Sequence, residues 1–97
     1  LGVSEGFTYD LAKTIVNGEC TSVTISNVQL GGMPLNPSVD YLVAVNSFLA
    51  DGGDNFTTFT EASARVTWGL DLDALTTYLG ENSPVSPPET DRVNELN

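Results

Sequence analysis

Residues 41–56 read YLVAVNSFLADGGDNF and join an apolar run to a pair of glycines flanked by phenylalanine and aspartate. The run Tyr41–Val45 is apolar at both odd and even positions, which is typical of a strand covered on both faces. We therefore expect it to form the centre of a sheet. Gly52 and Gly53 then allow the chain to bend and to approach an external group, because they carry no side chain that would collide with it. This bend is the candidate functional site.

The segments before this run predict strands joined by tight turns. Apolar residues alternate with small or polar ones near the start of the chain, which predicts a half-buried strand that ends at Asp10. Asn17–Gly18 predicts a tight turn. A second strand is expected through residues 23–30, where Gly31–Gly32 turns it into a short return segment, Met33–Leu35. These patterns together favour a hairpin-rich first half.

The segments after the glycine pair are less regular. Residues 56–59 fit either a strand or a helix, Ala62–Ala64 predicts a helical turn, and Arg65–Trp68 predicts a short strand. We therefore expect only short elements between the glycine pair and residue 70.

A helix follows, with Asp71 as its N-cap and Gly80 at its end, because leucines recur at helical spacing between them. The tail, residues 83–97, contains prolines and is expected to be extended, with a last edge strand at Arg92–Val93. Together these patterns predict an α+β fold, a mixed sheet with few short helices, in a single domain over residues 1–97.

Composition excludes several classes of function for this segment. The 97 residues include 13 acidic and three basic side chains, a formal charge of −10 that repels nucleic acids and anionic membranes. The chain has no histidine and one cysteine, so the usual zinc-ligand spacings and histidine-based catalysis are absent. No run is apolar enough to predict a membrane span. We expect neither a nucleic-acid partner nor catalytic machinery here.

Four motifs, taken in order, resemble a known family. They are Phe-Thr-Tyr-Asp at residues 7–10, Gly-x-Pro-Leu at 32–35, Tyr-x-Val-Ala-x-Asn at 41–46 and Phe-Leu-Ala-x-Gly-Gly-Asp at 48–54. In this order they resemble the C-terminal domain of the 5′-nucleotidase and UDP-sugar hydrolase family, which includes 2′,3′-cyclic phosphodiesterases. The resemblance implies the fold of that domain. Because the chain begins at Leu1 in what looks like a strand, we expect it to be a truncated version.

The resemblance implies a division of labour between two domains. Proteins of this family are exported phosphoester hydrolases of nucleotide catabolism, whose separate N-terminal metallophosphoesterase domain holds two divalent metal ions and the catalytic groups. This chain would then supply substrate binding, with no cofactor, no metal ligand and no catalytic residue of its own, and would be inactive in isolation. The expected location is extracellular, periplasmic or at the cell surface.

The resemblance also assigns roles to single residues. Phe48 matches the position whose ring stacks on the nucleobase, and Asp54 matches the position whose carboxylate accepts hydrogen bonds from ribose hydroxyls. Gly52 and Gly53 would let the loop fold around the sugar, and Asn46, at the end of the preceding motif, completes the candidate set. Stacking suits any base, because every base has a π face.

Two departures from the family pattern lie directly after these residues. Asn55 and Phe56 stand where the family usually has a glycine and another aromatic. Because asparagine tolerates a positive φ better than most residues, we expect the loop to keep its shape. Phe56 is expected in the core. Judged without the family motif, Phe48 would better fit a core position, since most aromatics after an apolar strand pack inside.

A second class of function is compatible with the same residues. The segment Asp51–Asp54 fits an acidic turn or a calcium loop, because hard cations favour clustered carboxylates. The alternative is thus a small acidic extracellular binding or adhesion module with a calcium-binding loop. A calcium loop needs oxygen ligands at alternate positions, whereas a nucleoside site needs an aromatic before the glycines and an acid after them. Phe48 and Asp54 satisfy the second pattern.

Overall fold

The computed structural model describes residues 1–97 and contains two compact units. One unit combines Leu1–Asp40 with Pro87–Asn97, and the other is Tyr41–Ser86. The first holds a four-stranded sheet, and the second holds short helices, so the expected α+β class is confirmed. That residues 1–97 form a single domain stays a prediction.

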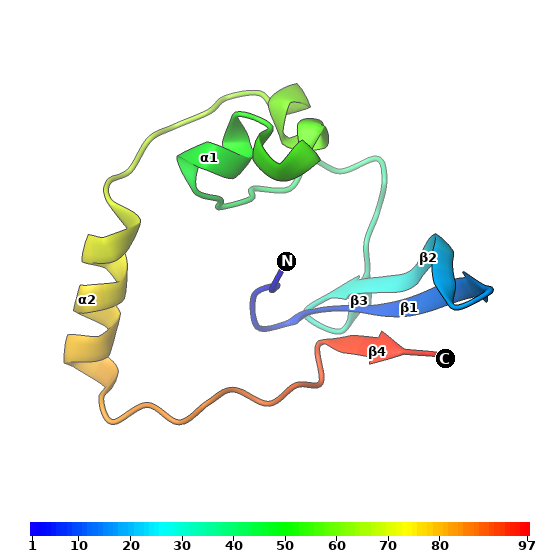
Figure 1. Ribbon diagram of the computed structural model, residues 1–97. Helices are drawn as coiled ribbons and strands as arrows, with labels where there is room; N and C mark the ends of the chain where they lie inside the picture. The colour runs from blue at the N-terminus through cyan, green and yellow to red at the C-terminus, as the bar shows by residue number, and fades with distance from the viewer. The chain divides into compact units, whose positions relative to one another are not determined.

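The sheet of the first unit has the order β3-β2-β1-β4 (Figure 1). Its strands are β1 (Phe7–Val16), β2 (Glu19–Leu30), β3 (Met33–Pro34) and β4 (Val93–Glu95). The first three pair antiparallel in sequence order, whereas β4 runs parallel to β1. The sheet is therefore mixed, as expected.

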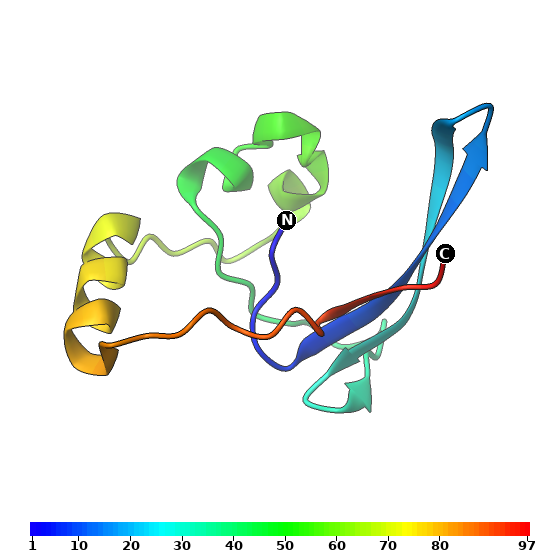
Figure 2. The same cartoon turned by 60° about the horizontal axis from the view of Figure 1, so that its bottom comes forward.

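The turn between β1 and β2 is the two-residue turn that the sequence predicts. Asn17 and Gly18 both have positive φ, 53° and 82°, the conformation that matches the twist of paired strands. Val16 pairs directly with Glu19, and the ladder continues without a loop toward Phe7. Figure 2 shows β1 and β2 continuing together as a twisted ribbon beyond the shorter strands.

The expected end of the first strand at Asp10 is wrong, because the carboxylate is accommodated on the sheet. Asp10 accepts hydrogen bonds from the side-chain amides of Asn27 on β2, at 3.3 Å, and Asn94 on β4, at 3.1 Å. Asn27 has a φ of 49° beside a register shift between Thr8 and Asp10. A polar residue inside a strand therefore joins three strands instead of ending one.

The second hairpin and the last strand agree with the sequence prediction. Gly31 and Gly32 have φ of 62° and 80°, and β3 pairs with the end of β2. The strand β4 includes Val93 and lies at the edge of the sheet. Besides the ladder with β1, the residues that flank β4 make two further backbone hydrogen bonds, from Tyr9 N to Arg92 O and from Leu96 N to Leu11 O.

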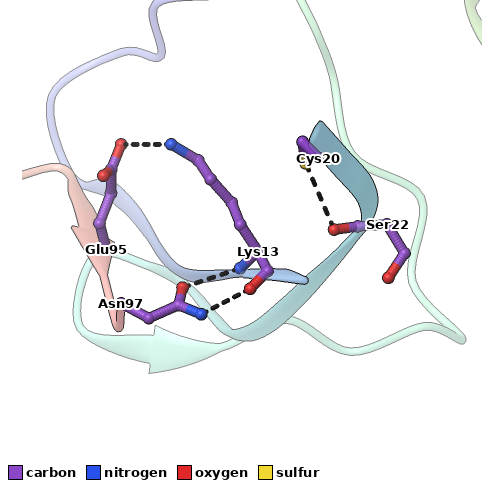
Figure 3. Close-up of polar contacts among 5 residues, drawn as sticks. All are labelled: Lys13, Cys20, Ser22, Glu95 and Asn97. Atoms are coloured by element: carbon purple, nitrogen blue, oxygen red, sulfur yellow. Dashed lines mark hydrogen bonds and ion pairs between the residues drawn. The ribbon is translucent and has the colours of Figure 1, made fainter. Parts of the chain in front are cut away.

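Side chains at the C-terminus add further contacts to β1 (Figure 3). The amide of Asn97 donates to the carbonyl of Lys13 and accepts from its backbone N–H at 2.8 Å, while the ammonium of Lys13 lies 3.3 Å from Glu95. Figure 3 also shows the exposed thiol of Cys20 directed at the carbonyl of Ser22, 3.5 Å away. The tail is thus tied to the sheet by its last residues.

The second unit contains no strand. Its elements are α1 (Ser47–Ala50), two 3₁₀ helices, η1 (Gly53–Asn55) and η2 (Thr57–Glu61), and α2 (Asp71–Asn82). The expected central strand at Tyr41–Val45 is wrong, and Leu42 is fully exposed. An apolar strand needs hydrogen-bonded neighbours, and the four strands of the chain pair only among themselves.

Two other predictions for this unit are also wrong. Ala62 has an extended backbone and Ala64 a left-handed one, with φ of 56°, so residues 62–64 form no helical turn. Arg65–Trp68 forms no strand. Of residues 56–59, which the sequence leaves open between strand and helix, Phe56 is the N-cap of η2 and the other three lie within it. In this region short-range 3₁₀ hydrogen bonds replace the sheet pairing that β-branched residues would favour.

The helix α2 is present as predicted, but both of its ends differ. Leu70 is the N-cap, and Asp71 is the first helical residue, where a carboxylate interacts favourably with the free N–H groups. Gly80 does not end the helix, which continues to Asn82. The amide of Asn82 donates to the carbonyl of Tyr78, and Pro84 follows two residues after Asn82. A glycine within a helix costs about 1 kcal/mol and does not by itself stop it.

No side chain in either unit is buried. The apolar residues of β1 and β2 are half-buried or exposed, and the rings of Phe7 and Tyr9 meet edge to face with centroids 6.3 Å apart. None of the helices has the length and apolar character that a membrane crossing requires. Local hydrogen bonds and turn geometry, more than a core, therefore shape the candidate site.

Candidate functional site

Asn46 begins the helix that carries Phe48. Its backbone is extended, and its side-chain oxygen accepts a hydrogen bond from the N–H of Leu49 at 2.9 Å. This is the usual N-cap arrangement, which satisfies a donor that the first helical turn leaves without a partner. Asn46 therefore caps the helix that carries Phe48.

Gly52 produces the reversal after α1. Its φ is 85°, and its N–H donates to the carbonyl of Leu49 at 2.9 Å. A Cβ at this position would lie 3.1 Å from Cγ2 of Thr60, so the chain passes close to η2 as well. The left-handed backbone and the close approach both favour glycine here.

Gly53 lies against the ring of Phe48. A Cβ at Gly53 would lie 2.6, 2.6 and 2.7 Å from Cε1, Cζ and Cε2 of Phe48. Nearly equal distances to three ring carbons put this position over the face of the ring, because a point beyond its edge would be much closer to Cζ. One face of the ring thus covers the glycine backbone, and the side chain remains 58% exposed.

Asp54 and Asn55 continue the loop in the left-handed conformation. Their φ values are 53° and 64°, so the expectation of a positive φ at Asn55 is confirmed. Asp54 is exposed, and its carboxylate makes no hydrogen bond or ion pair with the rest of the chain. Its oxygens are available to an external donor.

The other carboxylate of the loop has a partner. Asp51 Oδ1 lies 2.7 Å from Nη1 of Arg65 in an ion pair with a hydrogen bond. The two aspartates that flank the glycines therefore differ, since one is paired and the other is not. No group of three or more Asp, Glu, Cys or His side chains comes together in the chain in a way that could hold a metal ion.

Phe56 is not in a core, contrary to the sequence-based expectation. Its side chain is 38% exposed, and its ring packs against Phe59 with centroids 6.0 Å apart. This pair follows the loop, whereas Phe48 precedes it and contacts the glycine. The two aromatics thus have different surroundings, as the sequence suggested, although neither is buried.

The structure therefore brings together Phe48 and Gly53 directly, with Asp54 as the next residue along the chain. An aromatic side chain that is more than half exposed can stack on a planar group, and an unpaired carboxylate can accept hydrogen bonds from hydroxyls. The arrangement holds no nucleophile paired with a base. It is suited to binding.

Sequence reasoning missed the contacts that shape this loop. The sequence does not reveal that Arg65 pairs with Asp51. The support of Phe48 by Gly53 was not foreseen either, because spacing along the chain does not show which side a ring occupies. A signal for the ion pair exists in composition, since Arg65 is the only cation among residues 41–86.

Comparison with known proteins identifies relatives of this chain. The family described as 5′-nucleotidase, C-terminal domain, matches residues 1–61, which include the whole candidate site. An apyrase of Aedes albopictus is 40% identical over 60 residues, and an apyrase of Aedes aegypti is 37% identical over 60 residues. Protein UshA of Yersinia enterocolitica is 30% identical over 73 residues. No solved structure matches the chain significantly.

These matches cover much of the chain but little of the relatives. Each apyrase alignment spans 62% of this chain and 11% of the apyrase, and the UshA alignment spans 74% of this chain and 13% of UshA. The chain therefore spans about a tenth of the length of the curated relatives it matches. The family match covers more than half of the chain, and it agrees with the mixed sheet and with the glycine loop. The chain belongs to the 5′-nucleotidase C-terminal domain family.

Proposed function

We propose that this chain is the substrate-binding part of an exported 5′-nucleotidase-type phosphoester hydrolase that acts in nucleotide catabolism. In this proposal Phe48 stacks on the nucleobase, and Asp54 accepts hydrogen bonds from the ribose hydroxyls. The family membership supports the parent activity, and the loop geometry supports the mode of binding. An extracellular, periplasmic or cell-surface location belongs to the same proposal.

One observation carries the proposal. The ring of Phe48 has one face against Gly53 and is more than half exposed, and an unpaired Asp54 follows that glycine. A stacked base gains about 1–3 kcal/mol, largely regardless of its identity. A hydrogen bond to a charged acceptor adds about 1.5–3 kcal/mol. The aromatic would then supply affinity, and the carboxylate would select substrates that carry ribose.

The chemistry of hydrolysis is assigned to a different part of the polypeptide. The proposal places two divalent metal ions and their ligands in an N-terminal metallophosphoesterase domain. The present chain does not fit such a centre, because it has no histidine and no converging group of three acidic residues. Its own contribution is to orient the nucleoside so that the phosphate reaches that domain.

The isolated chain is therefore expected to lack phosphatase activity. Purified residues 1–97 should release no phosphate from a nucleoside monophosphate above the blank rate, with or without added divalent metal ions, as measured by colorimetric phosphate release. Turnover that copurifies with the chain through repeated purification, with or without added metal ions, would contradict the assignment of catalysis to another domain.

Replacing Asp54 tests the proposed selection of ribose. In the full-length enzyme, Asp54→Asn should raise the KM for a nucleoside monophosphate about tenfold or more, because a charged acceptor becomes neutral. The same substitution should have little effect on an analogue that lacks both ribose hydroxyls. Steady-state kinetics with the two substrates measures the difference.

A matched control is available in the same unit. Asp73 is an exposed carboxylate on α2, and Asp73→Asn removes the same charge away from the loop. It should leave both KM values near those of the unmodified enzyme. If Asp54→Asn affected the dideoxy analogue as strongly as the ribonucleotide, a role in ribose recognition would be excluded.

A further inference from the structure

We propose that Arg65 is a positioning residue for the clamp loop, defined as residues 51–54. Through its ion pair with Asp51, Arg65 keeps the glycine bend against the ring of Phe48. Asp54 then remains the unpaired carboxylate that accepts hydrogen bonds from the ribose hydroxyls. This inference rests on the proposed function and extends it to a residue outside the loop.

The geometry of the pair makes this role physically reasonable. Nη1 of Arg65 lies 2.7 Å from Oδ1 of Asp51, and the two residues are 14 positions apart. Asp51 is the C-cap of α1, the residue at which the helix ends and the loop begins. The ion pair therefore closes a segment that contains the whole clamp loop together with η1 and η2.

The other contacts that hold this segment are local. No side chain in the chain is buried, so core packing does not determine the position of the loop. The close approach of Gly52 to Thr60 also ties the loop to η2, beside the backbone hydrogen bonds of the turns. A single side-chain contact therefore contributes more to stabilising the conformation of the loop than it would beside a packed core.

Charge gives the pair a second effect. Among residues 41–86 Arg65 is the only cation, against six carboxylates. Without it, Asp51 would add an uncompensated negative charge three residues from Asp54, beside the proposed site of an anionic nucleotide. Repulsion between exposed charges at this range weakens binding and is reduced by salt.

The size of the expected effect follows from exposure. The side chains of Arg65 and Asp51 are 52% and 66% exposed, and exposed pairs alter an equilibrium by about two- to fivefold. Loss of Arg65 should therefore affect nucleotide binding less than loss of Phe48 or Asp54. An effect of this size is measurable in KM.

The test uses the full-length enzyme with four variants: Arg65→Gln, Arg65→Lys, Asp51→Asn and the double variant Asp51→Asn/Arg65→Gln. Arg65→Gln should raise the KM for a nucleoside monophosphate about two- to fivefold at low salt and less at high salt, with kcat for a small aromatic phosphate unchanged. Arg65→Lys should remain near the unmodified enzyme, because an ammonium group can still pair with Asp51. The double variant should be no worse than Arg65→Gln, since the two residues act through one contact.

Lys13→Gln provides the matched control, because it removes one positive charge from an exposed ion pair in the other unit. It should leave the KM for nucleotide unchanged. An unchanged KM for Arg65→Gln, or equal losses on both substrates, would overturn the positioning role. If Arg65→Gln does not fold, Asp51→Asn decides by the same criteria, because it removes the other partner of the same ion pair. Because Phe48→Ala is measured in parallel, a selective effect there with none for Arg65 refutes only this inference, whereas no selective effect at Phe48 refutes the proposed function.

Discussion

Phe48→Ala in the full-length enzyme is expected to raise the KM for a nucleoside monophosphate by roughly five- to more than a hundredfold. A base stacked on an aromatic side chain contributes about 1–3 kcal/mol, and each 1.36 kcal/mol corresponds to about a factor of ten. The kcat for a small aromatic phosphate should change little, because that substrate reaches the metal centre without needing the loop. Parallel steady-state kinetics on both substrates measures the selectivity.

The loss should be similar for purine and pyrimidine nucleotides, since stacking does not depend on hydrogen bonds to the base. Trp68→Ala serves as the control, because Trp68 is an almost fully exposed aromatic in the same unit and lies outside the loop. It should leave both kinetic constants nearly unchanged. Equal losses on nucleotide and aromatic phosphate after Phe48→Ala would assign Phe48 a structural role.

Gly53→Ala is expected to have an effect close to that of Phe48→Ala, although it removes no atom from the proposed contact with the base. The added Cβ would lie 2.6 Å from the Phe48 ring, well inside contact distance, so the ring must move. The backbone at Gly53 does not have a positive φ, so alanine adds no backbone strain. Stability should therefore change by little, while the ring leaves its position.

Two comparisons make this prediction specific. The double variant Phe48→Ala/Gly53→Ala should raise KM no further than Phe48→Ala alone, because both changes act on one ring and effects within one contact are not additive. Gly80→Ala, in α2, is the matched control, since nothing lies within 4 Å of the Cβ that it adds. Should Gly53→Ala leave the nucleotide KM unchanged, the glycine would not be the support for the ring.

The sequence predictions are accurate where a structure depends on residues that are neighbours in the sequence. Asn17–Gly18 and Gly31–Gly32 specify turns through their own φ preferences, and both turns are present. The strands beside them follow, because a two-residue turn sets the pairing of the residues on either side. The helix over residues 71–82 was predicted from leucine spacing, but its ends were not. Helix ends depend on capping contacts that periodicity does not reveal.

The predictions that fail depend on partners distant in sequence. Tyr41–Val45 has the composition of a central strand, yet a strand exists only where another strand offers hydrogen bonds, and none does so here. Asp10 was expected to end a strand, but side-chain amides on β2 and β4 donate hydrogen bonds to its carboxylate. Composition therefore shows which secondary structures a segment can form, whereas pairing with distant strands decides which one it forms.

For the candidate site, the sequence by itself determined which residues lie around the glycine bend and, through the family motif, that Phe48 and Asp54 are the ones to examine. Only the tertiary structure decided that Phe48 covers Gly53 with one face, and that Arg65 pairs with Asp51 and not with Asp54. The reason is that side-chain directions and ion pairs between distant residues form only when the loop folds back on itself. The pattern of neighbouring residues does not predict how the loop folds back.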